Sequence, residues 1–459
     1  MMLLSQAAQI LSARLVGADG GFTAVSSDTR SIRPGDLFFA LKGENFDGAQ
    51  FVAAAAQAGA VGAVVCADSA IEHAPCPLLR VADSRLALGG LAADWRKRFA
   101  IPVVAITGSN GKTTVKEMLA GILRAATGDA DSVLATKGNL NNDIGMPLTL
   151  LQLRARHRYA VIEMGMNHAG EIDYLTRIAR PDVALVNNAS GAHLQGLGSV
   201  EAVAHAKGEI FAGLRGDGAA VINADDAHAA VWRNLASDHR MFDFSLEHAA
   251  TVQGKWRAQG YGGVLQVRAP AGEMCVVLQV PGEHNARNAL AAATAALALD
   301  VPPATIAAAL ESFGGVAGRL QRKRAKGGAT LIDDTYNANP ASLHAALEVL
   351  AQASGKRVFV FGDMGELGDD AARFHCEAGI AARALGIERL FALGALSAGA
   401  AREFGVGAQH FEHVEELYGA LDKVLEADTT VLVKGSRFMK MERIVQFCAA
   451  HKEETCCSH

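Results

Sequence analysis

Short apolar runs alternate with helix-length stretches along most of the chain, and this alternation predicts the main elements. In the middle of the chain the predicted strands are Val103–Thr107, Tyr159–Met164 and Val183–Asn187, with a helix from Thr113 to Ala126. Nearer the C-terminus they are Met274–Val280, Ala329–Asp333, Arg357–Phe361 and Thr430–Val433, with helices at Glu283–Asp300 and Ser342–Ala351. Strands that alternate with helices are typical of right-handed βαβ units and parallel sheets.

The N-terminal part has its own pattern. Helical spacing of apolar residues predicts one amphipathic helix, carried by Leu3, Leu4, Ala7, Ile10, Leu11 and Leu15. A strand at Phe38–Leu41, a helix at Phe51–Ala58 and a strand at Ala60–Cys66 are expected next.

The chain has 459 residues, more than one core usually organises. We therefore expect an α/β fold of three domains: an N-terminal α/β domain (1–98), a central parallel-sheet domain (99–314) and a C-terminal Rossmann-like domain (315–459). The pair Gly314–Gly315 marks the second join.

Composition excludes several classes of protein. The net charge is −5 and no long basic run occurs, which disfavours a nucleic-acid binder. The N-terminus lacks a positive leader, and the longest alanine-leucine stretch, Ala289–Leu299, is too short to span a bilayer, so we expect neither a signal peptide nor membrane insertion. Seven scattered cysteines suit a reducing cytoplasm. Cys456 and Cys457 could ligate a metal, but they lie in a polar tail, and the alternative is a frayed terminus.

The most informative segment is a glycine-rich loop between a predicted strand and a helix. It reads Thr107, Gly108, Ser109, Asn110, Gly111, Lys112, Thr113 and Thr114. Backbone N–H groups of such a loop bind phosphate oxygens, a lysine reaches the β- and γ-phosphates, and a threonine hydroxyl ligates Mg²⁺. Ile106 occupies the place of a standard Walker glycine, so the loop is a shorter variant; a chance Gly–Lys–Thr–Thr turn is the alternative.

Polar residues follow two of the predicted strands, where α/β sheets bind ligands. Glu163 is a candidate magnesium ligand or else a solvated loop carboxylate, and His168 is a substrate contact or a surface residue. His193 lies beyond the next strand, and histidine is a less usual magnesium ligand than an oxygen donor.

Lys207 follows on a predicted helix. It is a phosphate-pairing or surface lysine, or a lysine carbamate, which requires a desolvated, neutral amine. The residues alone do not distinguish these possibilities.

Several segments taken together resemble the Mur ligase family, which includes folylpolyglutamate synthetase. They are Thr107–Thr114, Lys137–Gly145, Glu163–Glu171, Gly282–Ala289, Gly318–Gln321 and Asp333–Pro340. They occur in the family's order and span most of the chain. The resemblance implies a UDP-binding N-terminal domain, a central ATPase domain and a mobile C-terminal domain.

Further segments resemble the branch of the family that adds a D-alanyl-D-alanine dipeptide. These are DDTYNANP at Asp333–Pro340, the run Gly362–Gly368, Ser27–Arg30 and Pro34–Ala40. The Asp–Asn–Pro–Arg motif of the diaminopimelate-adding member is absent. The loop before His193 is slightly altered, with Ala192 at its end.

The resemblance implies a role for each matching residue. It makes Glu163 and His193 magnesium ligands and Lys207 a carbamylated lysine that supports the metal, and it makes Lys112, Lys207, His193 and Asn142 the catalytic set. It places Asn285 and Asn288 at the adenosine. It places Arg319 and Asp334 on the side of the nucleotide site that the C-terminal domain forms. Substrate-binding residues are implied at Ser27, Asp28, Thr29, Arg30, Asn337 and Asn339.

The implied reaction consumes ATP with Mg²⁺ and joins D-alanyl-D-alanine to UDP-N-acetylmuramoyl-tripeptide through an acyl phosphate, in peptidoglycan synthesis. We expect a cytoplasmic monomer. The alternatives are another amino-acid-adding Mur ligase, a folate ligase, or a P-loop module that binds ATP without chemistry; an inactive scaffold should lack the Lys–Thr pair, which is present.

Overall fold

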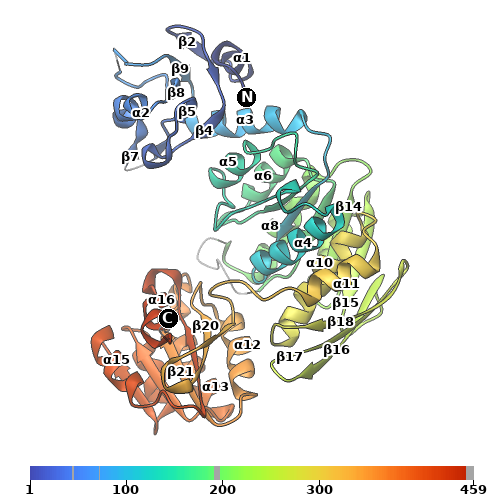
Figure 1. The fold of residues 1–459 in the computed structure, drawn as a ribbon, viewed down its shortest axis with the longest axis vertical. Helices are drawn as coiled ribbons and strands as arrows, with labels where there is room; N and C mark the ends of the chain where they lie inside the picture. The colour runs from blue at the N-terminus through green and yellow to red at the C-terminus, as the bar shows by residue number, and fades with distance from the viewer. Residues whose placement is uncertain (44–45, 72, 191–196, 451–459) are drawn as a thin grey trace, which may run out of the picture.

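The structure is a computed structural model, and it describes residues 1–43, 46–71, 73–190 and 197–450. Three α/β units follow one another along the chain, the N-terminal one blue, the middle one green to yellow and the C-terminal one orange to red (Figure 1). The predicted α/β class is confirmed. His193, Ala192, Cys456 and Cys457 lie outside the described residues.

The N-terminal unit contains a five-stranded sheet in the order β2-β9-β8-β5-β4. Its strands are β2 (Arg14–Val16), β9 (Leu78–Val81), β8 (Gly62–Cys66), β5 (Asp36–Phe39) and β4 (Ala24–Ser26), parallel except for β2. Two short strands, β1 (Met2–Leu3) and β3 (Gly21–Phe22), pair antiparallel, as do β6 (Lys42–Gly43) and β7 (Phe46–Asp47). Helix α2 (Val52–Gln57) precedes β8.

The predicted N-terminal helix is too long, and this is a correction. Helix α1 covers only Leu4–Ile10, and Ser12 adopts a left-handed backbone with φ of 50° that ends it. Leu15 instead pairs with Leu79 in the sheet. Leu15, the last apolar residue of the predicted helical pattern, therefore belongs to the edge strand β2.

The central unit is built on a nine-stranded sheet in the order β11-β12-β10-β13-β14-β15-β16-β17-β18. The parallel strands are β11 (Val133–Ala135), β12 (Tyr159–Glu163), β10 (Val103–Thr107), β13 (Val183–Val186), β14 (Ala219–Asn223), β15 (Arg240–Ser245) and β16 (Val252–Gln259). Strands β17 (Gly262–Ala269) and β18 (Gly272–Leu278) extend the sheet antiparallel. Strand β18 overlaps the predicted strand Met274–Val280, whereas β17 was not predicted.

Both faces of this sheet are covered, which explains why β10 is apolar throughout. Val104 and Ile106 face a core with α4 (Lys112–Thr127), α10 (Glu283–Leu297) and α11 (Pro303–Glu311). Val103 and Ala105 face the opposite core. The helices on that side are α3 (Ser84–Lys97), α5 (Gly145–Leu150), α6 (Glu171–Ala179), α8 (Val200–Gly208) and α9 (Ala229–Leu235).

Helix α3 joins the first unit to the second, since it packs on α5 and α6 (Figure 1). Gly89 permits the close approach, because a Cβ there would lie 2.0 Å from the Tyr174 hydroxyl. Arg96 is 4% exposed and donates to the carbonyl of Ala179 at 3.1 Å. The Trp95 indole N–H donates to the Leu153 carbonyl at 3.2 Å. The two units therefore share one continuous core.

The C-terminal unit has a six-stranded sheet in the order β19-β20-β24-β21-β22-β23. The strands are β19 (Gln321–Arg324), which is antiparallel, β20 (Thr330–Asp334), β24 (Thr429–Lys434), β21 (Lys356–Gly362), β22 (Arg389–Leu393) and β23 (Ala408–Phe411). Helices α12 (Pro340–Ala351), α13 (Ala371–Ala384) and α14 (Ser397–Phe404) cover one face, and α15 (Val414–Asp422) and α16 (Glu442–Cys448) cover the other. Within the described ranges, no helix has the length and apolar character needed to cross a membrane.

Candidate functional site

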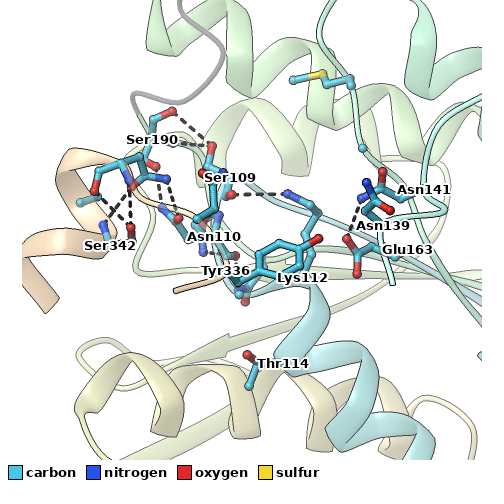
Figure 2. A pocket seen from close by; sticks show the side chains of 18 of the residues that line it. Ser109, Asn110, Lys112, Thr114, Asn139, Asn141, Glu163, Ser190, Tyr336 and Ser342 are labelled. Carbon is cyan, nitrogen blue, oxygen red and sulfur yellow. Dashed lines mark hydrogen bonds between the residues drawn. The ribbon is translucent and has the colours of Figure 1, made fainter. Parts of the chain in front are cut away.

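A cleft of about 1690 Å³ lies at the carboxyl end of β10, between the central and C-terminal units, and reaches the start of α3. Most of the residues predicted from the sequence line it. They are Ser109, Asn110, Gly111, Lys112, Thr114, Asn142, Glu163, Asn285, Asn288, Arg319, Asp334, Asn337 and Asn339. Figure 2 shows one part of this cleft, where the phosphate loop faces residues of the C-terminal unit.

The glycine-rich loop connects β10 directly to α4, as predicted. Gly111 is the N-cap of α4 and has a φ of 79°, a left-handed conformation that glycine adopts without strain. A Cβ on Gly111 would lie 2.3 Å from Asn288 Oδ1 and 2.6 Å from Asn187 Nδ2, so only glycine fits. The loop therefore aims the start of a 16-residue helix, and its positive end, at the cleft.

Asparagines from the neighbouring strand hold the loop in place. The backbone N–H of Asn110 donates to Asn188 Oδ1 at 2.9 Å, and Asn187 Nδ2 donates to the Asn110 carbonyl at 3.1 Å. Asn187 Nδ2 also donates to Asn288 Oδ1 on α10 at 2.9 Å. The sequence analysis had not assigned a role to Asn187 or Asn188; their only signal was a polar pair directly after a buried strand.

Lys112 lies along the loop. Its Nζ donates to the Gly108 carbonyl at 2.6 Å. It also donates to the Ser109 carbonyl at 3.4 Å (Figure 2). Burial lowers the pKa of Lys112, Glu163 opposes this change, and the charge of Arg319 lowers the pKa further. The amine therefore lies among opposing charges inside the loop that is expected to bind phosphate.

Thr113 and Glu163 meet at the base of the cleft. Thr113 Oγ1 donates to Glu163 Oε2 at 3.0 Å. Asn141 Nδ2 donates to Glu163 Oε1 at 2.8 Å (Figure 2). Glu163 is only 2% exposed. A carboxylate and a hydroxyl at one point form an oxygen-rich donor pair of the kind that Mg²⁺ prefers. Asn141, to which the sequence had given no role, is thus the amide that contacts this carboxylate.

Asn142 has a different local contact. Its Oδ1 accepts a hydrogen bond from the backbone N–H of Gly145 at 2.8 Å at the start of α5, while the side chain lines the cleft. Among the residues that the structure describes, no three His, Cys, Asp or Glu side chains gather as a metal cluster. The described residues would thus contribute mainly the oxygen donors of Glu163 and Thr113 to a magnesium site.

Lys207 lies in the last turn of α8 (Val200–Gly208) and is buried, with 1% of its surface exposed. Burial lowers its pKa well below the ordinary value, and the positive charge of Lys112 lowers it further. Burial therefore shows that the surface-lysine alternative is wrong, and it favours the neutral amine that a carbamate requires.

Arg319 reaches the phosphate loop from the C-terminal unit. Its Nη2 donates to Thr113 Oγ1 at 3.1 Å, and its guanidinium lies over the ring of Tyr336, 4.1 Å from the centroid. A second contact joins the same two units, since Asn339 Nδ2 donates to Asn110 Oδ1 at 2.8 Å. Tyr336 was missed by the sequence analysis.

One wall of the cleft, where the nucleoside is expected, is formed by α10 and by the end of β20. Asn285 and Asn288 are buried on α10, and His284 beside them has a pKa lowered to about 4, chiefly by burial. Asp334 accepts from the buried Lys434 Nζ and from the backbone N–H of Leu320 at 3.1 Å. Asn337 lies nearby, its carbonyl accepting from Lys434 Nζ at 3.0 Å.

The four residues Ser27, Asp28, Thr29 and Arg30 do not line this cleft. They lie in the N-terminal unit, where Asp28 pairs with Arg30 at 2.7 Å and where this hydrogen-bonded pair lowers the pKa of Asp28 to about 2. Thr114 does line the cleft but lies apart from Lys112 and Glu163 in Figure 2.

Comparison with known proteins matches three stretches of the chain to family models. Residues 21–96 match the Mur ligase family catalytic domain, residues 106–296 the Mur ligase middle domain, and residues 318–437 the Mur ligase glutamate ligase domain. One relative is UDP-N-acetylmuramoyl-tripeptide–D-alanyl-D-alanine ligase of Escherichia coli K12, 43% identical over 99% of both chains. The protein of the same name from Bacillus subtilis is 34% identical over 92% of both chains.

Solved structures agree with the sequence relatives. A crystal structure of MurF from Acinetobacter baumannii has a TM-score of 0.89 and 37% identity, and covers 96% of this chain and 97% of that one. MurF from Thermotoga maritima in complex with ADP has a TM-score of 0.79 and 27% identity, over 92% and 96%. By matched domains, full-length relatives and shared fold, the chain belongs to the Mur ligase family.

Proposed function

We propose that this protein uses ATP to join D-alanyl-D-alanine to UDP-N-acetylmuramoyl-tripeptide, a step of peptidoglycan precursor synthesis. The names of the 43% and 34% identical relatives support the substrates. The observation that carries the chemistry is the meeting of Thr113, Glu163 and Arg319 at one end of the phosphate loop.

The reaction needs an activated acid, because a carboxylate is a poor electrophile. An oxygen of the tripeptide carboxylate attacks the γ-phosphorus of ATP, the bond to ADP breaks, and an acyl phosphate forms. The dipeptide amine then attacks the carbonyl carbon, inorganic phosphate leaves, and the nitrogen loses a proton. The first step gathers negative oxygens, so charge neutralisation and positioning supply most of the catalysis.

The chain's own cations suit that demand. Lys112 lies in the loop and would turn from the Gly108 carbonyl to the β- and γ-phosphates. Arg319 approaches from the other side, so the transferred group would lie between two positive charges from different units. Asn339 joins the units beside it and would help keep water from the acyl phosphate.

We propose that Mg²⁺ is held by Glu163 and Thr113, with His193 and a modified Lys207 completing the site. The oxygen donors of the first two residues fit the ion. When bound, Mg²⁺ would neutralise phosphate charge and orient the γ-phosphate. Glu163→Gln should weaken Mn²⁺ binding measured by electron paramagnetic resonance and raise the Mg²⁺ concentration needed for half-maximal activity; unchanged values for both would contradict this assignment.

Lys207 is proposed to carry a carbamate. Its neutral Nζ would attack the carbon of CO₂, forming an N–C bond and releasing a proton, and the new anion would lie in the field of Lys112. We expect Lys207→Ala to lose at least about ten-fold in kcat, the cost of roughly 1.4 kcal/mol of transition-state stabilisation. Short carboxylic acids should restore part of it. A folded Lys207→Ala variant that no acid rescues would count against the carbamate.

The remaining assignments follow from position. We propose that four residues of the N-terminal unit bind the UDP end of the substrate: Ser27, Asp28, Thr29 and Arg30. Asn142 and Asn337 would contact the rest of the substrate within the cleft. The domain limits 98/99 and 314/315 are proposed on the same basis.

A monomer is favoured because one chain supplies both walls of the cleft. A cytoplasmic location is favoured because the five cysteines among the described residues are all unpaired.

The function is tested by acceptor dependence. Purified protein would be given ATP, Mg²⁺ and UDP-N-acetylmuramoyl-tripeptide, and ADP release would be measured with D-alanyl-D-alanine, D-alanine, diaminopimelate, lysine or glutamate. We expect release only with the dipeptide. Release with a single amino acid would favour another amino-acid-adding Mur ligase, and slow hydrolysis insensitive to every acceptor would favour an ATP-binding module.

A further inference from the structure

The hairpin between β16 and β17 contacts the start of the C-terminal unit. Its turn is Gly260–Tyr261, and Gly260 has a φ of 62°. The Tyr261 hydroxyl donates to the carbonyl oxygen of Leu320 at 2.8 Å. The hairpin belongs to the central sheet, whereas Leu320 directly precedes β19. The Tyr261 hydroxyl therefore joins the two units through Leu320, and Tyr261 itself does not line the cleft of the phosphate loop.

The backbone at Leu320 is strained. Its φ is 51°, a left-handed value that a branched side chain rarely adopts, and such strain persists only where contacts on both sides impose it. The N–H of Leu320 donates to Asp334 Oδ1 at 3.1 Å, within the C-terminal unit. Its carbonyl accepts from Tyr261, in the central unit. The residue is thus fixed from two directions.

The residue before Leu320 is Arg319, whose guanidinium reaches Thr113. Gly318 has a φ of 72°, and its carbonyl accepts from the N–H of Tyr336, the residue on which Arg319 stacks. Tyr261 is therefore connected to the phosphate loop through the backbone of Leu320 and the side chain of Arg319.

We propose that Tyr261 is a positioning residue for the ligase reaction: its hydroxyl fixes the Leu320 carbonyl so that Arg319 is held on the phosphate loop. This inference rests on the proposed function, and it assigns a role to a hairpin outside the catalytic cleft.

The groups around Tyr261 do not replace its hydroxyl in fixing the Leu320 carbonyl. A cavity of about 410 Å³ borders the contact and is lined by Tyr261, Leu320 and Gly315, so there is space beside Leu320 into which its backbone can shift when the hydroxyl is removed. Arg322 lies over the tyrosine ring at 5.2 Å from its centroid, a contact that phenylalanine would keep. Burial raises the pKa of Tyr261, so the hydroxyl stays protonated and donates throughout the working pH range.

The test is a double-mutant cycle of Tyr261→Phe and Arg319→Ala, with Tyr418→Phe as the control. Tyr418 stacks on Phe447 in the C-terminal unit and does not line the cleft. Losing one hydrogen bond should lower kcat about three- to ten-fold. The KM for the UDP substrate and the melting temperature should stay unchanged, and the control should match the wild type. In the Arg319→Ala background, Tyr261→Phe should cause no further loss.

Three results would overturn the proposal. The first is an unchanged kcat in Tyr261→Phe, whether or not the melting temperature falls, and the second is an equal loss in both backgrounds. The third is an unchanged rate of hydrogen exchange. Hydrogen–deuterium exchange at residues 318–320, measured without substrates, should be faster in Tyr261→Phe than in wild type. Because exchange needs no turnover, a wild-type enzyme inactive with the dipeptide would refute the proposed function and leave the exchange result to decide the role of Tyr261.

Discussion

Replacing Gly111 by alanine tests the phosphate loop most directly. Alanine at a φ of 79° costs about 1 kcal/mol from left-handed strain. Its Cβ would also lie 2.3 Å from Asn288 Oδ1 and 2.6 Å from Asn187 Nδ2, so the hydrogen bond between these buried amides must break. An unpaired buried amide costs about 1–3 kcal/mol.

Together these costs amount to about 2–4 kcal/mol, or roughly a 30- to 700-fold loss in kcat/KM for ATP, since 1.4 kcal/mol is ten-fold. The assay is ADP release at varied ATP, alongside thermal unfolding. Gly121→Ala is the matched control, because Gly121 lies within α4 and its Cβ would meet nothing within 4 Å. It should leave activity unchanged and add about 0.5–1 kcal/mol of stability.

Activity of Gly111→Ala within three-fold of wild type would refute this reasoning, because the loop would then tolerate a Cβ in the space that the two asparagines occupy. Equal losses in Gly111→Ala and Gly121→Ala would also refute it, since they would trace the effect to the helix as a whole.

Two further predictions concern stability. His284 has a folded pKa of about 4, below its unfolded value of 6.5, so the unfolded chain binds more protons between these pH values and stability must fall as pH drops through that window. Because the ring faces the cleft, where water screens it, we expect the free energy of unfolding to fall by about 1–2 kcal/mol between pH 7 and 4.5 in denaturant titrations. If stability fell as steeply with pH in His284→Gln, His284 would not be the group responsible. Gly89→Ala should lower the free energy of unfolding by about 1–3 kcal/mol, because the new Cβ would overlap Tyr174. Gly90→Ala is the control, because its Cβ would lie 3.7 Å from its nearest neighbour, and it should leave this free energy unchanged. Equal stabilities of the two variants in thermal unfolding would contradict the close packing of α3 on α6.

Local sequence patterns predicted the elements around the phosphate loop well. Strand β10 spans Val103–Thr107 as predicted, because burial on both faces selects an uninterrupted apolar run. Helix α4 extends one residue beyond the prediction at each end. The glycines, Lys112 and Thr113 are adjacent in sequence, so their proximity could be inferred without a structure.

Contacts between distant segments could not be predicted in this way. Arg319 and Thr113 are 206 residues apart, and the amides of Asn187 and Asn288 are 101 residues apart. Their pairing depends on how separate units pack, which leaves no periodic trace in the sequence. The β16–β17 hairpin was missed for a related reason, since its alternating strands extend a sheet that the βαβ pattern had already accounted for.

Helix α3 has a mechanical consequence. Any bending between the first two units would have to withdraw Arg96 from the Ala179 carbonyl and expose Trp95, so these units move as one block. Among the described segments, the connection near Gly315 is then left as the hinge, and any opening of the third unit would have to release Arg319 from Thr113 and Asn339 from Asn110.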